Sequence, residues 1–409
     1  MTSQVKTNDY FIIFSLWLMV FASSSQVMII SPILPEIASE LNTAKSLLGY
    51  LITVYATMIG VCAIIMGPLS DKIGRRKILL IGSSGMTIAL LLHSMADNFV
   101  SLLILRAFAG MAGGVLSGSA VSYVGDYFPY ERRGWANGWI MSGIAMGQIL
   151  GIPLGTFLAE FYGFKFPFIL FGAIMGVTTI LIFFRLPQPN VELQISKITL
   201  KSTFTKYGNL LRVGEIRSVA FSYLLMFLSL SIFLIYLPDW LVEEFDVSLS
   251  EIGWVFFAGG IVNAITGPNA GKLSDRIGRK NMIIFSCLGL ATLMALTTYI
   301  ITSFWIAYIA FPVAMLLIAM RISPFQALSS ELVKSNNRGS LMSLLVAIGN
   351  VGSGLAGAIA GPLYDELGYV SNTLFGAYTI ILTAYIVMRF VPEPELKNNT
   401  VQETLEVAE

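Results

Sequence analysis

The sequence has little charge and few residues of the kinds that build metal or redox sites. Charged residues make up 12% of the 409 residues and the net charge is +1, whereas an ordinary soluble domain carries about a quarter charged residues. The two cysteines, Cys62 and Cys287, both lie in apolar runs, so we expect neither a disulfide framework nor a thiolate metal site. The near-neutral charge also argues against a nucleic-acid partner. We therefore expect no metal and no cofactor.

Catalytic groups are equally scarce. An enzyme site needs a nucleophile with its base, or a metal cluster, but the chain has one histidine, His93, and no pair of carboxylates inside an apolar run. The sequence therefore predicts a protein that is not an enzyme.

Hydrophobic residues, in contrast, are abundant, at 56% of the chain with a mean hydropathy of +0.76. A membrane span takes about 20 apolar residues, and twelve runs of this kind occur, each ended by charges, Pro or Gly. Because each backbone polar group must be satisfied within the segment in lipid, these runs are helices. The expected spans are 11–34, 46–69, 77–96, 99–124, 135–159, 163–185, 216–240, 250–272, 281–301, 304–330, 338–361 and 370–391. The predicted fold class is an all-α membrane protein with twelve transmembrane helices.

The basic residues are distributed unevenly between the two sides of these helices. If the N-terminus is cytoplasmic, most of the 25 Lys and Arg residues fall in cytoplasmic segments, and the external loops are acidic, as at Glu243 and Asp246. This asymmetry follows the positive-inside rule and predicts that both termini are cytoplasmic. We expect a multi-pass protein of the cytoplasmic (plasma) membrane.

Composition also suggests boundaries along the chain. The segment 187–215 contains Pro187, Pro189 and several lysines but no run long enough to span. We interpret 1–186 as an N-terminal six-helix bundle, 187–215 as a cytoplasmic linker, 216–392 as a C-terminal six-helix bundle and 393–409 as an acidic cytoplasmic tail.

A short motif occurs twice, 204 residues apart. The first copy, GPLSDKIGRRK, begins at Gly67, and the second, GKLSDRIGRK, begins at Gly271; seven of the first ten positions are identical. Gly67 permits close helix approach, Gly74 permits a tight turn of positive φ, and Asp71 places a carboxylate beside Arg75. The repeat predicts two homologous bundles related by a pseudo-two-fold axis along the membrane normal, which is typical of transporters whose cargo binds between the repeats.

On these residues the chain resembles the major facilitator superfamily over nearly its whole length. The resemblance implies two pseudo-symmetric six-helix bundles, with helices 1, 4, 7 and 10 around a central cavity and rocking that opens the cavity alternately to each side. It also implies that each copy of the repeated motif forms a charge latch with the N-terminal end of a helix in the opposite bundle, helix 11 for the first copy and helix 5 for the second, when the cytoplasmic side is shut. The implied latch residues are Gly67, Asp71, Gly74, Arg75, Arg76, Asp126, Gly271, Asp275, Gly278, Arg279 and Glu331. The alternative is that the motif only anchors the chain through positive charge and a tight turn.

Two arginines lie deep inside the predicted spans, away from their ends. Arg106 is about 10 Å deep in helix 4, on the same face as Gly110, Gly113, Gly114 and Ser117. A buried Arg costs at least about 2.5 to 3.5 kcal/mol, and by resemblance Arg106 matches a helix 4 arginine associated with proton coupling in antiporters; snorkelling to the interface is the alternative. Arg321 in helix 10 is similarly deep, near Pro324, and either faces the cavity or pairs with a backbone carbonyl.

Helix 5 has a glycine pattern. Its members, Gly138, Gly147, Gly151 and Gly155, keep the spacing of the helix 5 motif of drug:proton exporters, but Ile152 and Thr156 depart from that motif and Pro153 is displaced by one residue. Small-residue helix packing is the alternative reading.

Other polar residues on the lining helices are candidates for cargo binding or coupling, although each is also explained as a packing residue. These are Gln26, Tyr223, Tyr236, Asp239 and Gln326. Asp239 ends helix 7 and is alternatively a solvated helix end.

The sequence therefore favours a transporter over a channel, because duplicated halves with latches suit alternating access better than a static pore. The helix 5 pattern favours proton-coupled export of a small organic compound, with proton-linked uptake of a small organic anion as the alternative. Two intramembrane arginines without a mid-helix carboxylate favour a neutral or anionic cargo. We expect protons as the coupling ion. We also expect the protein to lie in the lipid bilayer and to be a monomer.

Overall fold

The computed structural model describes residues 9–189, 200–333 and 335–393, except for the side chains of residues 67–72, 200–204, 206 and 335–337. Within these residues the secondary structure is helical and contains no strand. Twelve helical spans are long and apolar enough to cross a membrane. The predicted fold class, an all-α membrane protein with two six-helix bundles, is confirmed.

The first half comprises α1 (Asp9–Met28), α2 (Leu34–Leu41), α3 (Lys45–Ile73), α4 (Arg75–Leu92), η1 (His93–Met95), α5 (Phe99–Leu116), α6 (Ser119–Tyr127), α7 (Tyr130–Met146), η2 (Gly147–Gly151), α8 (Ile152–Tyr162) and α9 (Lys165–Arg185). Helix α10 (Leu200–Arg212) follows it. The second half comprises α11 (Gly214–Ile235), α12 (Leu237–Phe245), α13 (Leu249–Ile277), α14 (Arg279–Ile300), α15 (Phe304–Glu331), α16 (Ser335–Leu367) and α17 (Tyr369–Phe390).

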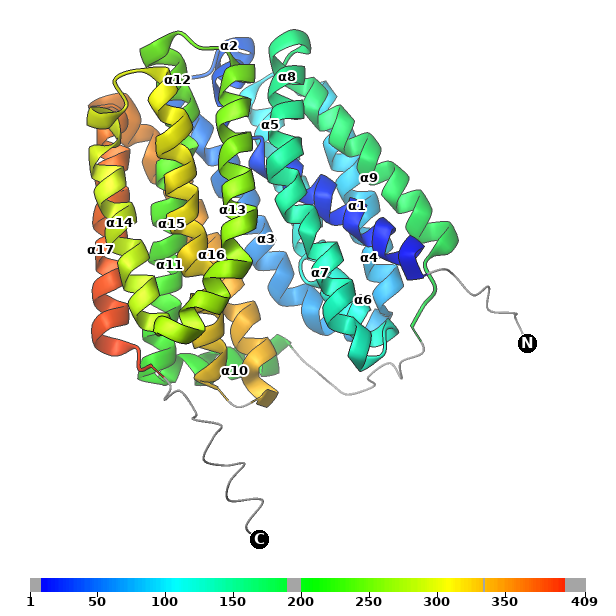
Figure 1. Ribbon diagram of the computed structural model, residues 1–409. Coiled ribbons are helices and arrows are strands. Elements are labelled where there is room, and N and C mark those ends of the chain that lie inside the picture. Colours follow the sequence, from blue (N-terminus) through cyan, green and yellow to red (C-terminus); the bar gives the residue numbers. More distant parts are fainter. Residues whose placement is uncertain (1–8, 190–199, 334, 394–409) are drawn as a thin grey trace.

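The two halves stand side by side, and α10 lies at the same end of the molecule as the start of α1 and the end of α17 (Figure 1). We call this end the terminal face and the other end, with α2 and α12, the opposite face. Helix α3 packs along α16, and α13 packs along α8 and η2. These are the most extensive contacts between the halves.

Several expected spans are interrupted, and Pro or Gly explains each break. The first expected span, 11–34, stops at Met28, and the separate helix α2 begins at Leu34, with Pro35 in its first turn. The fourth breaks at Gly118, whose φ is +73°. The seventh breaks at Tyr236, before Pro238 in the first turn of α12. Because the sequence pattern registers only hydrophobicity, it joined segments that these residues separate.

The fifth span contains a π-helical turn, η2, between α7 and α8. Pro153, the second residue of α8, lies just after this turn and has no N–H to donate to the carbonyl four residues earlier. A π turn absorbs such a missing bond without ending the helix. The glycine pattern of this span therefore coincides with a local irregularity of the helix.

The repeated turns have nearly the same backbone geometry. Helices α3 and α13 both have 29 residues, and each ends at a glycine of positive φ, +102° at Gly74 and +94° at Gly278. Both turns lie at the terminal face, because each follows a helix that runs to that face. A side chain with a Cβ would be strained at either position.

Candidate functional site

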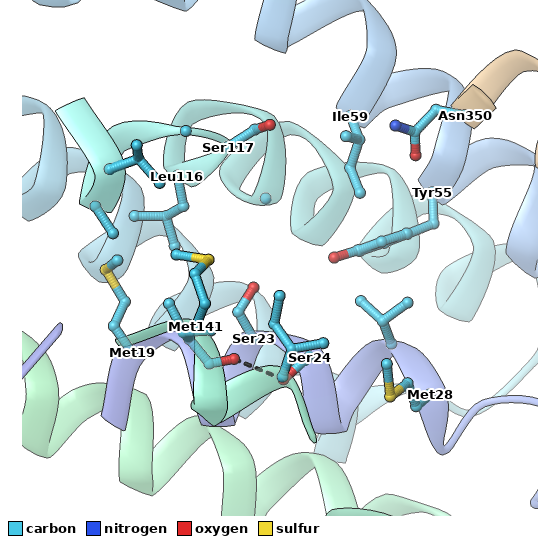
Figure 2. A pocket seen from close by; sticks show the side chains of 17 residues that line it. Met19, Ser23, Ser24, Met28, Tyr55, Ile59, Leu116, Ser117, Met141 and Asn350 are labelled. Atoms are coloured by element: carbon cyan, nitrogen blue, oxygen red, sulfur yellow. Dashed lines mark hydrogen bonds between the residues drawn. The ribbon is translucent and has the colours of Figure 1, made fainter. Parts of the chain in front are cut away.

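A cavity of about 370 Å³ lies against the inner side of the first half. Its walls come from α1, α3, α5, α6 and α7, and Asn350 of α16 lines it from the second half. Figure 2 shows the hydroxyl groups of Ser23, Ser117 and Tyr55 among apolar side chains such as Met19 and Met141. The cavity lining contains no charged residue. This composition suits an amphipathic molecule with one polar end.

Arg106, on α5, lies directly behind the cavity wall and is fully buried. Its Nη1 donates to Gln26 Oε1 at 2.9 Å, and its guanidinium lies over the Tyr55 ring, 4.2 Å from the centroid. Gln26 Nε2 in turn donates to Tyr55 Oη at 2.7 Å. Two of the sequence candidates, Arg106 and Gln26, are therefore bonded directly, and both contact Tyr55. Tyr55 was missed from the sequence because it lies on α3, the second transmembrane span, which is not among the expected lining helices.

The glycines of α5 bring it against α3 at this point. A Cβ on Gly110 would lie 2.6 Å from the Tyr55 carbonyl oxygen, and one on Gly114 would lie 2.5 Å from Cys62 Cβ. A Cβ on Gly113 would lie 2.9 Å from Tyr55 Oη. Only glycine at these positions lets the two helices approach closely enough for Tyr55 to stack on Arg106.

Arg321, on α15, is also fully buried. Its Nε, Nη1 and Nη2 have no hydrogen-bond partner among the described residues, and Cys287 of α14 lies close to it. It does not line the cavity, and among the described residues no backbone carbonyl pairs with it. Tyr223 packs against the rings of Phe227 and Phe325, beside the exposed Gln326.

The opposite face is closed by a cluster that joins the halves. The Lys45 ammonium on α3 forms ion pairs with Asp239, at 3.0 Å, and with Glu243 on α12. Tyr236 Oη donates to the Lys45 carbonyl at 2.6 Å and accepts from Gly49 N–H at 3.2 Å. Asp239 is only 1% exposed. The interpretation of Asp239 as a solvated helix end is wrong, because Lys45 from the other half covers it.

Below this cluster the backbones of α3 and α16 meet at glycines. Thr53 Oγ1 donates to the Gly354 carbonyl at 2.7 Å. A Cβ on Gly361 would lie 2.1 Å from the Ser46 carbonyl oxygen. In the described part of the chain, the hydrogen bonds and ion pairs between the halves run from the opposite face to mid-depth, where Asn263 Nδ2 donates to Gln148 Oε1 at 2.9 Å.

At the terminal face, the charges of the repeated motif pair within each half. Arg75 Nε donates to Asp126 at 2.5 Å. Arg279 pairs with Asp275 at 3.1 Å and with Glu331. The side chain of Asp71, together with position 67, lies outside the described side chains, as does the start of α16 at 335–337 to which the latch was expected to reach.

Two further members of the expected latch contact their own half. Arg76 donates to the Phe183 carbonyl of α9. Gly271 lies against Ser323 of α15, whose Oγ would be 2.9 Å from an added Cβ. Each copy of the motif is thus connected to the helices beside it.

Three of the four helix 5 glycines, which lie in η2 and α8, face α1. A Cβ would lie 2.5 Å from Ser24 Oγ at Gly147, 2.3 Å from Ser25 Oγ at Gly151 and 1.5 Å from Ile29 Cδ1 at Gly155. Gly138, in contrast, has no atom within 4 Å of such a Cβ. Pro153 lies against Gly253 of α13, whose added Cβ would be 3.2 Å from Pro153 Cα. The small residues of this pattern therefore let α1 pack closely on one side of this span and α13 on the other.

A second groove, of about 800 Å³, runs between α1 and α7 and reaches Ala264 of α13. It is lined chiefly by the aromatic side chains of Tyr10, Phe14, Trp17, Trp135 and Trp139. Trp17 Nε1 donates to Ser142 Oγ at 3.1 Å. Because polar groups gather in the smaller cavity, we place the candidate cargo site there.

Glu36, on α2, lies outside the membrane-spanning helices. Burial raises the pKa of its carboxyl group, and the carboxylates of Glu40 and Glu160 raise it further. A folded-state pKa above the ordinary value means that the folded protein binds the proton more tightly than the unfolded chain. Stability is therefore gained as the pH falls through the raised pKa and is lower above it.

We expect Glu36→Gln to raise the melting temperature at neutral pH and to flatten its pH dependence, measured against Glu244→Gln as control. A lower melting temperature in Glu36→Gln would contradict this.

Comparison with known proteins gives consistent results. A family model described as Major Facilitator Superfamily matches residues 16–217 and 219–407. The chain is 26% identical over 389 residues to the uncharacterized MFS-type transporter YwfA of Bacillus subtilis, covering 93% of this chain and 92% of that protein. It is 27% identical over 302 residues to the multidrug resistance protein MdtG of Proteus mirabilis, covering 72% and 74%.

Solved structures show the same fold. The crystal structure of a D-xylose-proton symporter superposes with a TM-score of 0.80 at 19% identity and covers 95% of this chain and 99% of that one. The inward-open xylose transporter XylE of E. coli gives a TM-score of 0.76 at 19% identity, with coverage of 97% and 100%.

Proposed function

Because the chain belongs to the major facilitator superfamily and is a multi-pass membrane transporter rather than an enzyme, we propose that it exports a small organic compound in exchange for protons. The helix 5 glycines support export, and so does the likeness to a multidrug resistance protein. The observation that carries the proposal is the cavity of about 370 Å³ beside the buried Arg106, with hydrogen-bonding groups but no carboxylate in its lining.

We propose that the terminal face is cytoplasmic, in the plasma membrane, on the basis of the positive-inside distribution of Lys and Arg. Under this orientation the cluster at Lys45 closes the external side, and the conformer faces inward. The residues before 187 and after 215 then act as two rigid bundles, and 187–215 connects them. The protein works as a monomer, since one chain supplies the whole lining of the cavity.

Proton exchange can be tested in proteoliposomes with an acidic lumen that contains the pH dye pyranine. We expect external chloramphenicol, a neutral probe, or 4-phenylbutanesulfonate, an anion that cannot carry a proton, to accelerate alkalinisation of the lumen. Ethidium, a cation, should be a poorer substrate, because Arg106 forms no ion pair with a carboxylate among the described residues. Liposomes without protein are the control.

The same assay distinguishes the second candidate, proton-linked uptake of an organic anion, which the uncompensated charge of Arg106 favours. In that case the sulfonate would acidify the lumen when the external medium is the acidic side, and an acidic lumen would give no response to external cargo. Failure of all three probes to move protons in either direction would contradict both candidates.

We propose that the repeated motif stabilises the conformer that is closed at the terminal face. Charges at a helix N-terminus contribute up to about 2 kcal/mol, which is enough to change a population ratio by more than tenfold. Asp126→Asn or Glu331→Gln should therefore slow proton-coupled flux by about tenfold, with normal expression and an unchanged melting temperature. Glu131→Gln, at the exposed start of α7, is the control. Undiminished flux in both variants would leave the motif as an anchor only.

A further inference from the structure

The hydroxyl hydrogen of Tyr55 has no acceptor among the residues that the structure describes. Tyr55 is 3% exposed, yet it lines the cavity, and Figure 2 shows its oxygen directed into the open space opposite Ser23. Within the described residues, the recorded hydrogen bond of this hydroxyl is one that it accepts, from Gln26 Nε2 at 2.7 Å. A phenol group can both accept and donate a hydrogen bond. The donor function of the Tyr55 hydroxyl is therefore left for a group in the cavity.

The direction of this hydrogen-bond chain follows from the chemistry of its members. A guanidinium group only donates, so the Gln26 atom that faces Arg106 must be the oxygen, as found at 2.9 Å. The Gln26 amide nitrogen then faces Tyr55 and must donate to it. Tyr55 Oη is thereby fixed as the acceptor, and its own hydrogen is left for a third group.

The charge behind this chain is not neutralised. In the described part of the chain, Arg106 has no ion pair with a carboxylate, and its Nε and Nη2 have no hydrogen-bond partner. In a low-dielectric interior a buried charge acts strongly on nearby groups, and hydrogen bonds in a chain polarise one another. The Arg106 charge therefore makes the Tyr55 O–H a stronger donor toward negative oxygen.

The rest of the cavity restricts where such an oxygen sits. The Tyr55 ring lies on Arg106, so the cation cannot be reached directly through this wall, and the hydroxyl is the group that the cargo meets. Met19, Met28 and Met141 form adaptable apolar walls. A cargo with an apolar body and one terminal oxyanion would place the oxyanion at Tyr55 and the body along the methionines.

We propose that Tyr55 is a cargo-binding residue whose O–H donates to a carboxylate of an amphipathic organic acid, with Gln26 and Arg106 as positioning residues behind it. This inference rests on the proposed transport function and gives its cargo a chemical class. It concerns the bound state only, so it holds for export or for uptake.

The test is equilibrium binding to the purified full-length protein by titration calorimetry, without any gradient. The probes are 4-phenylbutyrate, 4-phenylbutan-1-ol and 4-phenylbutan-1-amine, which share one apolar body and differ in the end group. We expect the native protein to bind the carboxylate at least about tenfold more tightly than the alcohol or amine, since a hydrogen bond to a charged group contributes about 1.5 to 3 kcal/mol.

Tyr55→Phe removes the hydroxyl but keeps the ring on Arg106. It should weaken carboxylate binding about tenfold and change alcohol binding less than twofold. Gln26→Glu should weaken carboxylate binding as well, although Tyr55 is intact, because the new carboxylate neutralises Arg106. Tyr50→Phe, five residues away on the same helix and 38% exposed, is the matched control and should bind like the native protein.

Carboxylate binding that is equally tight in Tyr55→Phe and the native protein would overturn the proposal, as would a preference of the native protein for the amine. Both results are independent of the liposome assay. Proton exchange in liposomes without the expected carboxylate binding would therefore show that the protein is a proton-coupled transporter with a different cargo. The melting temperature of each variant shows whether the fold is retained.

Discussion

Replacement of Arg321 by Met is expected to stabilise the protein and to stop transport. The guanidinium is fully buried, and its three nitrogens have no hydrogen-bond partner in the described part of this conformer. A buried charge of this kind costs at least about 2.5 to 3.5 kcal/mol in a membrane protein, and apolar replacement of buried ionic groups often stabilises by about 1 to 4 kcal/mol. The melting temperature in detergent should therefore rise.

Transport should nevertheless fall by at least about tenfold, because a charge that stabilises nothing in this conformer is expected to find its partner in the other one. Arg389→Met, at the exposed end of α17, should change neither quantity. A lower melting temperature in Arg321→Met would show instead that the arginine supports the fold of the second half. Full transport activity would remove it from the coupling mechanism.

Replacement of Gly49 by Ala is expected to open the opposite face. A Cβ at this position would lie 2.0 Å from the Gly357 carbonyl oxygen, and a Cβ on Gly357 would lie 2.4 Å from the Gly49 carbonyl oxygen. Both neighbours are backbone atoms of packed helices, so α3 and α16 must separate to accommodate a methyl group. The contacts that join the halves around Lys45 and Tyr236 would then be lost together.

Spin labels at Leu47 and Leu367, both exposed near the opposite face, would report this separation by double electron–electron resonance, after replacement of Cys62 and Cys287. We expect the distance distribution of Gly49→Ala to shift to longer values than that of the native protein. Gly134→Ala, where an added Cβ has no atom within 4 Å, should leave it unchanged. An unshifted distribution in Gly49→Ala would show that the two helices tolerate the methyl group without separation.

The duplicated motif is a feature whose local structure could be predicted from the sequence. Identical spacing at Gly74 and Gly278 predicted two homologous halves, and the two turns have closely similar dihedral angles at these glycines. A positive φ is a local property that glycine tolerates and other residues resist, so the sequence is sufficient to indicate it. The twelve apolar runs likewise correspond to the twelve helical spans.

The breaks in the helices and the partners of the buried polar groups were harder to predict from the sequence. The break at Tyr236 and the π turn at Gly147–Gly151 depend on how one proline is accommodated by its neighbours. Asp239 is indistinguishable in sequence from a solvated helix end until Lys45, 194 positions earlier in the chain, is placed beside it.

The sequence by itself determined the membrane, the helices and the duplication, because hydrophobic length and local backbone preference are properties of neighbouring residues. Only the tertiary structure decided that Tyr55 joins Arg106 and Gln26 at a cavity, and that Arg321 has no partner in the described part of this conformer. These are contacts between residues far apart in the chain. They depend on how whole helices pack, and the composition of one helix does not specify the face that its neighbour presents.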